Sequence, residues 1–149
     1  MDLIGVTERE RFANVGEYVS FAAACPVCRG EAPCSGGQAL TFGRLEWSIE
    51  ADCAVCGPSA ICGSGDMPAD LRERLLGERG PARLELPQQG ARTAVIMKVI
   101  RATLNVELNE ARKMLQAVQS GQHAATLPEI EQLARRLRAV GVEARAVRG

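Results

Sequence analysis

The sequence predicts an α+β fold in which a small β-rich module, held together by its cysteines, precedes a helix-rich half. All six cysteines lie between Cys25 and Cys62, as two copies of C-x2-C-x5-C that repeat every 28 residues. Beyond them the apolar residues recur mainly at helical spacing. The Gly-Pro break at 78–81 (ERGP) is the best boundary between the two parts. We therefore expect two domains, at residues 1–77 and 82–149.

The cysteine-rich module is expected to contain strands with short flanking helices. Thr7 and Glu10 fit a helix capping box, and 18–24 (YVSFAAA) is typical of a strand that ends at the first cysteine pair. Residues 31–38 (EAPCSGGQ) have the composition of a loop. Residues 45–50 (LEWSIE) alternate apolar and polar side chains, which predicts a half-buried strand leading to the second pair.

A short helix is expected after the last cysteine. It would begin near 63–67 (GSGDM), and Leu71 and Leu75 would share one face because they are one helical turn apart. Gly77 would end this helix, since glycine is common just beyond a helix C-terminus.

The second half is predicted to run strand, helix, helix, helix, strand. The ranges are 82–86 for the first strand, 92–104, 107–119 and 126–140 for the helices, and 142–147 for the closing strand. The third helix has the clearest start, because Thr126 and Glu129 have the spacing of a capping box. Its inward face is expected to carry Ile130, Leu133, Leu137 and Val140. The inward face of the second helix is expected to carry Leu108, Ala111, Leu115 and Val118.

The paired cysteines predict a structural metal site. Zinc in such sites is held tetrahedrally by four ligands, and two C-x2-C turns supply two thiolates each. The four expected ligands are Cys25, Cys28, Cys53 and Cys56. Antiparallel strands that bring the two turns together would form a zinc ribbon. Four protein ligands leave no open position, so the expected cofactor is a structural Zn²⁺ ion and not a catalytic one.

Cys34 and Cys62 each lie beyond a pair at an equivalent position, and three interpretations stay open for them. They are small buried apolar side chains, or a disulfide beside the metal site, or additional ligands. Trp47 is expected to pack over the metal site, with stacking on a nucleic-acid base as the alternative.

The charge divides between the two halves. Residues 1–77 hold 6 Lys/Arg against 11 Asp/Glu, a net charge of −5, whereas residues 78–149 hold 12 against 7, a net charge of +5. An acidic cysteine-rich half makes nucleic acid a less expected partner, and the basic half suits an acidic protein surface. No secretory signal or membrane-spanning apolar run is seen, so a cytoplasmic location is expected, where clustered cysteines bind metal more often than they form disulfides.

No catalytic constellation stands out in the sequence. We find no paired carboxylates in a recognisable setting, no phosphate-binding loop and no nucleophile motif. His123 is the single histidine and is expected in an exposed polar loop. Redox chemistry at the C-x2-C pairs is less expected, because each pair leads into glycine and loop residues and not into a helix. The chain is therefore predicted not to be an enzyme.

A resemblance extends over residues 82–148. The stretch 93–115 (TAVIMKVIRATLNVELNEARKML), followed by EIEQLARRLRAVGVEARAV, resembles the C-terminal domain of the bacterial ribosomal stalk protein. The resemblance implies a β-α-α-β-α-β order, with three helices on a three-stranded antiparallel sheet. Its middle strand would lie near 122–126. The whole chain also resembles bacterial proteins that pair a zinc-ribbon-like module with such a domain.

In the stalk family the first two helices of this domain recruit translational GTPases. Lys98, Arg101 and Arg112 match positions on or near that face, and the resemblance implies that they contact a partner. Thr93 stands where the family has a lysine, and the family's glycine-rich turn between the helices is absent from 102–107.

These observations together predict a non-enzymatic, zinc-stabilised protein–protein interaction protein. It would act as an adaptor or a regulator, with the translation machinery as the implied setting. The alternatives are a zinc-ribbon nucleic-acid-binding or transcription-associated protein, and an immunity or inhibitor protein.

Overall fold

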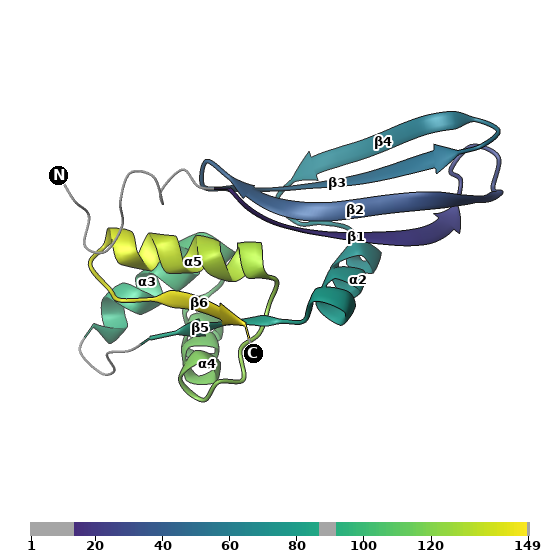
Figure 1. Ribbon diagram of the computed structural model, residues 1–149. Coiled ribbons are helices and arrows are strands. Elements are labelled where there is room, and N and C mark those ends of the chain that lie inside the picture. The colour runs from purple at the N-terminus through teal and green to yellow at the C-terminus, as the bar shows by residue number, and fades with distance from the viewer. Residues whose placement is uncertain (1–13, 87–91, 149) are drawn as a thin grey trace.

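The computed structural model describes residues 14–86 and 92–148, so the predicted capping box at Thr7 and Glu10 lies outside the described residues. It shows an α+β chain with one four-stranded and one two-stranded antiparallel sheet (Figure 1). The strands are β1 (Val15–Ala24), β2 (Glu31–Thr41), β3 (Arg44–Cys53), β4 (Gly57–Ser64), β5 (Ala82–Glu85) and β6 (Arg145–Arg148). The helices are α2 (Ala69–Arg79), α3 (Thr93–Leu104), α4 (Leu108–Gln119) and α5 (Leu127–Ala139).

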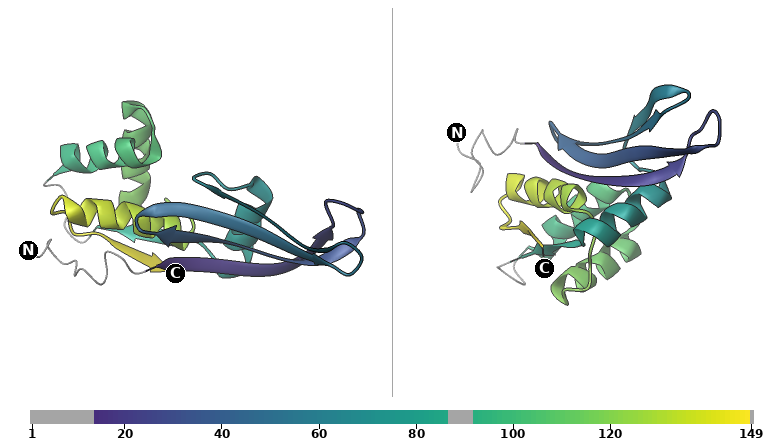
Figure 2. Two further views of the ribbon diagram at one scale, coloured as in Figure 1. Left: turned by 90° about the horizontal axis from the view of Figure 1, so that it is seen from above. Right: turned by 45° about the vertical axis from the view of Figure 1, so that its right-hand side comes forward.

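The four-stranded sheet is an antiparallel meander in which each strand pairs with the next along the chain. Side chains alternate between two faces of a strand, so the register decides which residues share a face. Val19 pairs with Gly36, Gly36 with Ile49, and Ile49 with Ile61, which places this row on one face. We call the face that carries this row, and that packs against α2 and α5, the inner face, and the opposite face the outer face (Figures 1 and 2).

Residues 31–38 form most of β2, so the loop predicted there was wrong. Gly36 contributes to the loop-like composition of this stretch, but in the structure it makes a close packing contact. A Cβ atom at Gly36 would lie only 2.7 Å from Cδ1 of Leu71 on α2. Glycine is thus needed because a helix side chain approaches the strand backbone closely.

Strand β4 was not predicted at all. It pairs with β3 through residues such as Ile61, which lies opposite Ile49. Most of its side chains are exposed, so the strand does not need apolar residues at every second position. Its sequence therefore lacks the alternation of apolar and polar residues by which a half-buried strand is predicted.

Helix α2 confirms the apolar face that was predicted for it. Leu71 and Leu75 are buried and form a small cluster with Val19 on the inner face of the sheet. The predicted end of the helix at Gly77 was wrong, because the helix continues to Arg79. It ends where Gly80 adopts a positive φ of 80°, a conformation that glycine accepts without strain.

The second half holds the larger core. Helices α3, α4 and α5 pack with β5 and β6 around fourteen buried apolar residues, among them Ile100, Leu115 and Leu137. The predicted capping box is confirmed, because the Thr126 side chain accepts from the Glu129 amide while the Glu129 side chain accepts from the Thr126 amide. The middle strand expected at 122–126 is reduced to an isolated bridge between Ala125 and Ala82.

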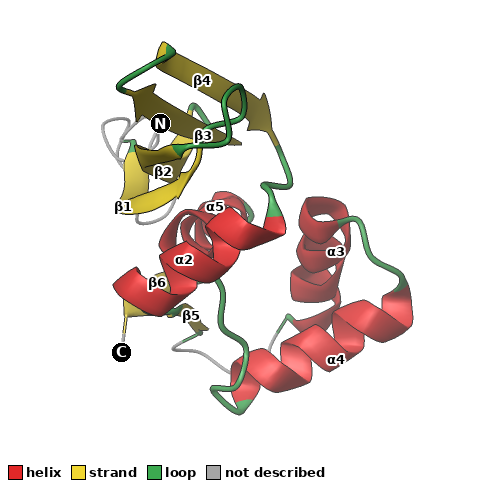
Figure 3. Cartoon of the chain, turned by 90° about the vertical axis from the view of Figure 1, so that its right-hand side faces the viewer, coloured by secondary structure: helices red, strands yellow, loops and turns green. Residues whose placement is uncertain are grey.

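Helix α5 joins the two halves, because it packs on β5 and β6 and also against β1, β2 and β3. Figure 3 shows α2 and α5 beside the four-stranded sheet, with α3 and α4 farther from it. Polar contacts cross this interface. Arg148 forms an ion pair with the buried Glu17 of β1, and Gln38 of β2 bonds to Glu129.

Among the described residues, no helix has both the length and the apolar character that crossing a membrane requires.

Candidate metal centre

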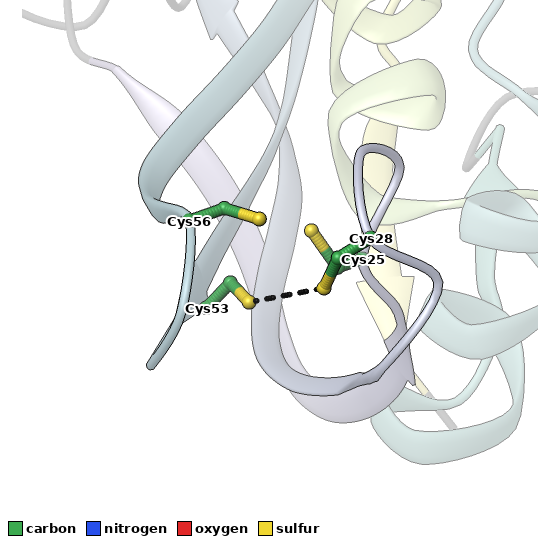
Figure 4. Close-up of side chains that lie close together, drawn as sticks. All are labelled: Cys25, Cys28, Cys53 and Cys56. Carbon is green, nitrogen blue, oxygen red and sulfur yellow. Dashed lines mark hydrogen bonds between the residues drawn. The ribbon is translucent and has the colours of Figure 1, made fainter.

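The two C-x2-C pairs occupy two connections of the four-stranded sheet. Cys25 and Cys28 lie in the turn between β1 and β2, and Cys53 and Cys56 lie at the turn between β3 and β4. In an antiparallel meander these two connections fall at the same end of the sheet. Figure 4 shows the four sulfur atoms, two from each turn, directed toward a common centre.

The spacing of the sulfur atoms fits a tetrahedral metal ion. The four Sγ atoms all lie within 4.8 Å of one another, and those of Cys28 and Cys53 are 3.6 Å apart. A zinc ion with Zn–S bonds of about 2.3 Å holds its sulfurs roughly 3.8 Å apart in a regular tetrahedron. These four cysteines, which we call the cysteine cluster, can therefore hold a metal ion with little movement.

The two turns present their thiols in the same way. In each turn the first cysteine, Cys25 or Cys53, is buried and the second, Cys28 or Cys56, is exposed. The buried pair forms a small cluster with Ala32 on the inner side of the sheet. One side of the site is thus sealed by protein, and the other lies at the surface where a metal ion can enter.

Backbone amides stabilise the thiolate form of the buried cysteines. The amides of Cys28 and Val27 lower the pKa of the Cys25 thiol to about 7, and the Val27 amide nitrogen lies 3.4 Å from its Sγ. The amides of Cys56 and Val55 lower the pKa of Cys53 in the same way. Hydrogen bonding with the thiol of Cys28 instead raises the pKa of Cys56 to about 12. A divalent cation is the group that would allow all four thiolates to coexist.

Cys34 and Cys62 lie outside the cysteine cluster, and both are free thiols. Cys34 of β2 pairs with Phe21 and Ala51 on the inner face, where its thiol is 3.5 Å from the carbonyl of Ala32. Cys62 of β4 pairs with Ser48, whose side chain is on the outer face. The two sulfurs are therefore on opposite faces of the sheet, separated by β3.

Two other residues are not where they were expected. Trp47 packs with the cluster formed by Val19, Leu71 and Leu75, and not over the cysteines, because it is six residues from Cys53 along β3. His123 is half-buried and not exposed, and burial lowers its pKa.

The basic residues singled out from the sequence lie on the surface of α3 and α4. Lys98 and Arg101 are exposed on α3, and Arg112 is exposed on α4. In the part of the chain that the structure describes, none of the three takes part in an ion pair. Two exposed leucines accompany them, Leu104 with 36% and Leu108 with 44% of its surface accessible. The inward orientation expected for Leu108 was therefore wrong, as it was for Val140 at the end of α5, which is 41% exposed.

Sequence reasoning missed a polar network where the two halves meet. The guanidinium of Arg72 forms an ion pair with Glu129, which also accepts from Gln38. Gln38 in turn accepts from the hydroxyl of Thr126. The helix cap at Thr126 was the one part of this network with a local sequence signal, because the other partners are 57 to 91 residues apart along the chain.

Comparisons of the chain with protein-family models, with curated proteins and with solved structures found no match. The cysteine cluster and the surfaces around it are therefore the observations that bear on function.

Proposed function

We propose that the chain is a zinc-stabilised protein-interaction protein, an adaptor or regulator, that binds an acidic partner surface through α3 and α4. The observation that carries this proposal is the pair of exposed leucines, Leu104 and Leu108, beside three basic side chains without ion-pair partners among the described residues. Exposed apolar groups with a charged rim are typical of protein interfaces.

Helical spacing supports a common surface for these residues. Lys98, Arg101 and Leu104 follow one another at intervals of three residues on α3. On α4, Leu108 and Arg112 are four residues apart, whereas Ala111 is buried in the core. We call the surface of Lys98, Arg101, Leu104, Leu108 and Arg112 the basic face.

Zinc is the metal that the donor set supports best. Four thiolates in a tetrahedron are typical of structural zinc, and their arrangement on two turns of an antiparallel sheet supports a zinc-ribbon-like module. All four positions are taken by protein, so the ion would hold the sheet together and would leave no place for a substrate.

The resemblance to the ribosomal stalk domain gives the proposal a setting. From β5 onward the elements run strand, helix, helix, a single bridge at Ala125, helix, strand, which is compatible with a β-α-α-β-α-β order. We propose that this half is a stalk-like domain and that its partner belongs to the translation machinery.

A pulldown from the native cell tests the basic face. The zinc-loaded full chain serves as bait, together with the double reversal Lys98→Glu/Arg101→Glu. A matched control, Arg83→Glu/Arg136→Glu, changes the net charge equally at two exposed arginines outside the face. We expect the first variant to lose partners that the wild type and the control retain.

Two results would contradict the proposal. Identical partner lists for the two reversals would remove the basic face from consideration. Loss of all captured proteins after nuclease treatment would show that nucleic acid is the primary partner, although the net charge of −5 in residues 1–77 argues against it.

A further inference from the structure

Strand β4 is an edge strand with one side open. In the described residues it hydrogen-bonds to β3 alone, and Figure 1 shows it at the border of the sheet. Among the described residues, helices α2 and α5 pack on the sheet mainly against β1, β2 and β3, and β4 is not among their main contacts. The other edge strand, β1, is covered by these helices, and the side chain of Arg79 donates to the Tyr18 carbonyl there.

The open edge lacks the features that normally prevent pairing with another chain. Exposed edges are usually protected by charged side chains, bulges or a very short strand. β4 is eight residues long, carries no charge, and has its one proline, Pro58, at the second position. Ile61, at its middle, is 60% exposed.

The outer face behind this edge is acidic and within reach. All outer-face side chains of β4 are small, and three of the four β3 residues opposite them are exposed carboxylates. The pairs, β4 residue first, are Pro58 with Asp52, Ala60 with Glu50, Cys62 with Ser48 and Ser64 with Glu46. Among the described residues, no ion pair involves these carboxylates, and the nearest cation on this face, Arg44, donates to Ser64.

The inner face behind the same edge is apolar. Ile61 lies beside Ile49, and Gly63 lies beside Trp47. An added strand would therefore meet apolar groups on one face and carboxylates on the other. Neighbouring strands are about 4.8 Å apart, so a long cationic side chain on it would extend over the small β4 side chains toward the carboxylates of β3.

We propose that β4 binds an extended peptide segment of a partner protein, in which basic and apolar residues alternate. The segment adds a fifth strand, with its backbone hydrogen-bonded to β4. Its basic side chains extend over the small side chains of β4 toward Glu46, Glu50 and Asp52, and its apolar side chains lie beside Ile61. This site is separate from the basic face of α3 and α4 and has the opposite charge.

A second copy of the chain fits this edge less well. If the β4 strands of two copies paired edge to edge, the carboxylates of the two β3 strands would lie on either side of the new strand pair and repel one another. β4 carries no cation that could offset this repulsion. Charge complementarity thus favours a basic peptide as the occupant.

The binding test uses a fluorescent eight-residue peptide of alternating lysine and valine, titrated into the zinc-loaded full chain. Two controls have glutamate in place of lysine, or the same lysines and valines in two blocks. We expect the alternating lysine peptide to bind at least tenfold more tightly than either control. Equal binding of the block peptide would overturn the proposal, because it would show attraction by charge alone.

Backbone pairing is tested by N-methylation of the peptide at all lysines or at all valines. Alternate amides of an extended strand point to opposite sides, so one set faces β4 and the other faces solvent. We expect one methylated peptide to lose binding at least tenfold and the other to retain it. Equal effects of the two sets would rule out edge pairing.

Two variants locate the site on the protein. Ala60→Lys places a cation at the open edge of β4. Ser20→Lys is its control and places a cation on the outer face of β1, at the opposite edge of the sheet. The two positions lie in one row across the sheet, because Ser20 pairs with Ser35, Ser35 with Glu50 and Glu50 with Ala60. We expect a loss of about fivefold or more for Ala60→Lys and less than twofold for Ser20→Lys, since a nearby charge contributes about 1 kcal/mol.

Equal weakening by both variants would overturn the assignment to β4. Sedimentation of the wild-type chain alone provides the remaining check. A dimer that Ala60→Lys disrupts would identify a second copy as the occupant in place of a peptide.

Discussion

The thiols of Cys25 and Cys53 are pre-arranged for a cation at the scale of single residues. Backbone amides lower the pKa of both, whereas the pKa of Cys56 is raised because it shares hydrogen bonds with its neighbours. Adjacent thiolates repel one another without a cation, and a divalent ion removes that repulsion. The hairpin turns thus supply the positions of the four thiols and favour the thiolate form of two of them.

Substitution of one ligand is expected to change the metal content, and substitution of a nearby non-ligand is not. Cys28→Ser should reduce bound zinc from about one ion per chain to well below one, because three thiolates and a hydroxyl form a weaker site. Cys34→Ser and Cys62→Ser should each retain one ion. Metal analysis of the purified chains by mass spectrometry measures this. Equal loss in all three variants would contradict the assignment of the ligands.

The two turns differ in one residue that carries backbone strain. Arg29 and Gly57 both follow the second cysteine of a pair, and both have a positive φ, of 67° and 84°. An arginine in this conformation costs about 1 kcal/mol or more, whereas glycine adopts it freely. The first turn therefore holds strain that the second avoids.

Arg29→Gly is expected to stabilise the zinc-loaded chain by about 0.5–1 kcal/mol in urea unfolding at fixed free zinc. Gly57→Ala, its matched opposite, should destabilise the chain by about 1 kcal/mol. No atom lies within 4 Å of a Cβ at Gly57, so this cost would come from the backbone conformation alone. A stabilising effect of Gly57→Ala would contradict this explanation.

At the scale of elements, the sequence was informative where the signal was local. The start of α5 was predicted from Thr126 and Glu129, since both partners of the cap are three residues apart. β2 was missed because Gly36 is explained by Leu71, which lies 35 positions away in the sequence. The residues of β4 carry no burial pattern, so only its pairing with β3 reveals it.

The start of α5 is also where stability should depend on pH. Burial raises the pKa of the Glu129 carboxyl, but the Arg72 guanidinium, the Thr126 amide and Gln38 together outweigh burial and lower it below 4.5. A lowered pKa means that the unfolded chain takes up the proton first as pH falls. The stabilisation is therefore complete above about pH 4.5 and is lost as pH falls through the folded-state pKa.

Glu129→Gln is expected to lower the free energy of unfolding by about 2 kcal/mol at pH 7, because Arg72 loses its ion-pair partner and α5 loses a charged cap. The difference from wild type should shrink as pH falls below 4.5. Unfolding of the two chains, compared at each pH, isolates this effect from the metal centre that they share. A difference that stays constant down to pH 3 would contradict it.

Protonation of His123 is expected to lower the stability of the chain at a higher pH than protonation of Glu129. Burial lowers its pKa from 6.5, so the unfolded chain binds this proton more readily and stability falls as pH drops below that value. In unfolding measured as a function of pH, His123→Gln should remove the decline in stability that sets in below about pH 6.5 and leave the Glu129 step in place.

At the scale of the whole molecule, the two halves differ in how much apolar core holds them. In the described residues, the core of the second half contains fourteen buried apolar residues, several of them on α5, whereas the helix-covered cluster of the sheet has three, Val19, Leu71 and Leu75. The cysteine motif predicts that the sheet depends on metal, because a small module with few apolar residues needs an additional constraint. The polar contacts that join the halves could not be predicted, since Gln38 and Glu129 are 91 residues apart and carry no pairing signal.

Removal of the metal should therefore loosen the sheet in a graded order. Zinc binding contributes on the order of 10–16 kcal/mol in small zinc-finger peptides, which is far more than a three-residue apolar cluster supplies. β4 is held by β3 and by the turn that carries Cys53 and Cys56, whereas β1 and β2 are also held by α2, α5 and the Glu17–Arg148 ion pair. Hydrogen exchange with a zinc chelator should show protection lost first and most in β4, then in β3, and least in β1.

Amides of α3, α4 and α5 should keep their protection to within about twofold in the same experiment, because their core does not include the cysteine cluster. Zinc added back should restore the protection of β4. A uniform loss across both halves would mean that the chain unfolds as one unit despite its two cores, and unchanged exchange in β4 would mean that the four cysteines do not staple the sheet. The contrast between β4 and β1 is the sharper readout, since both are edge strands of one sheet and differ in what covers them.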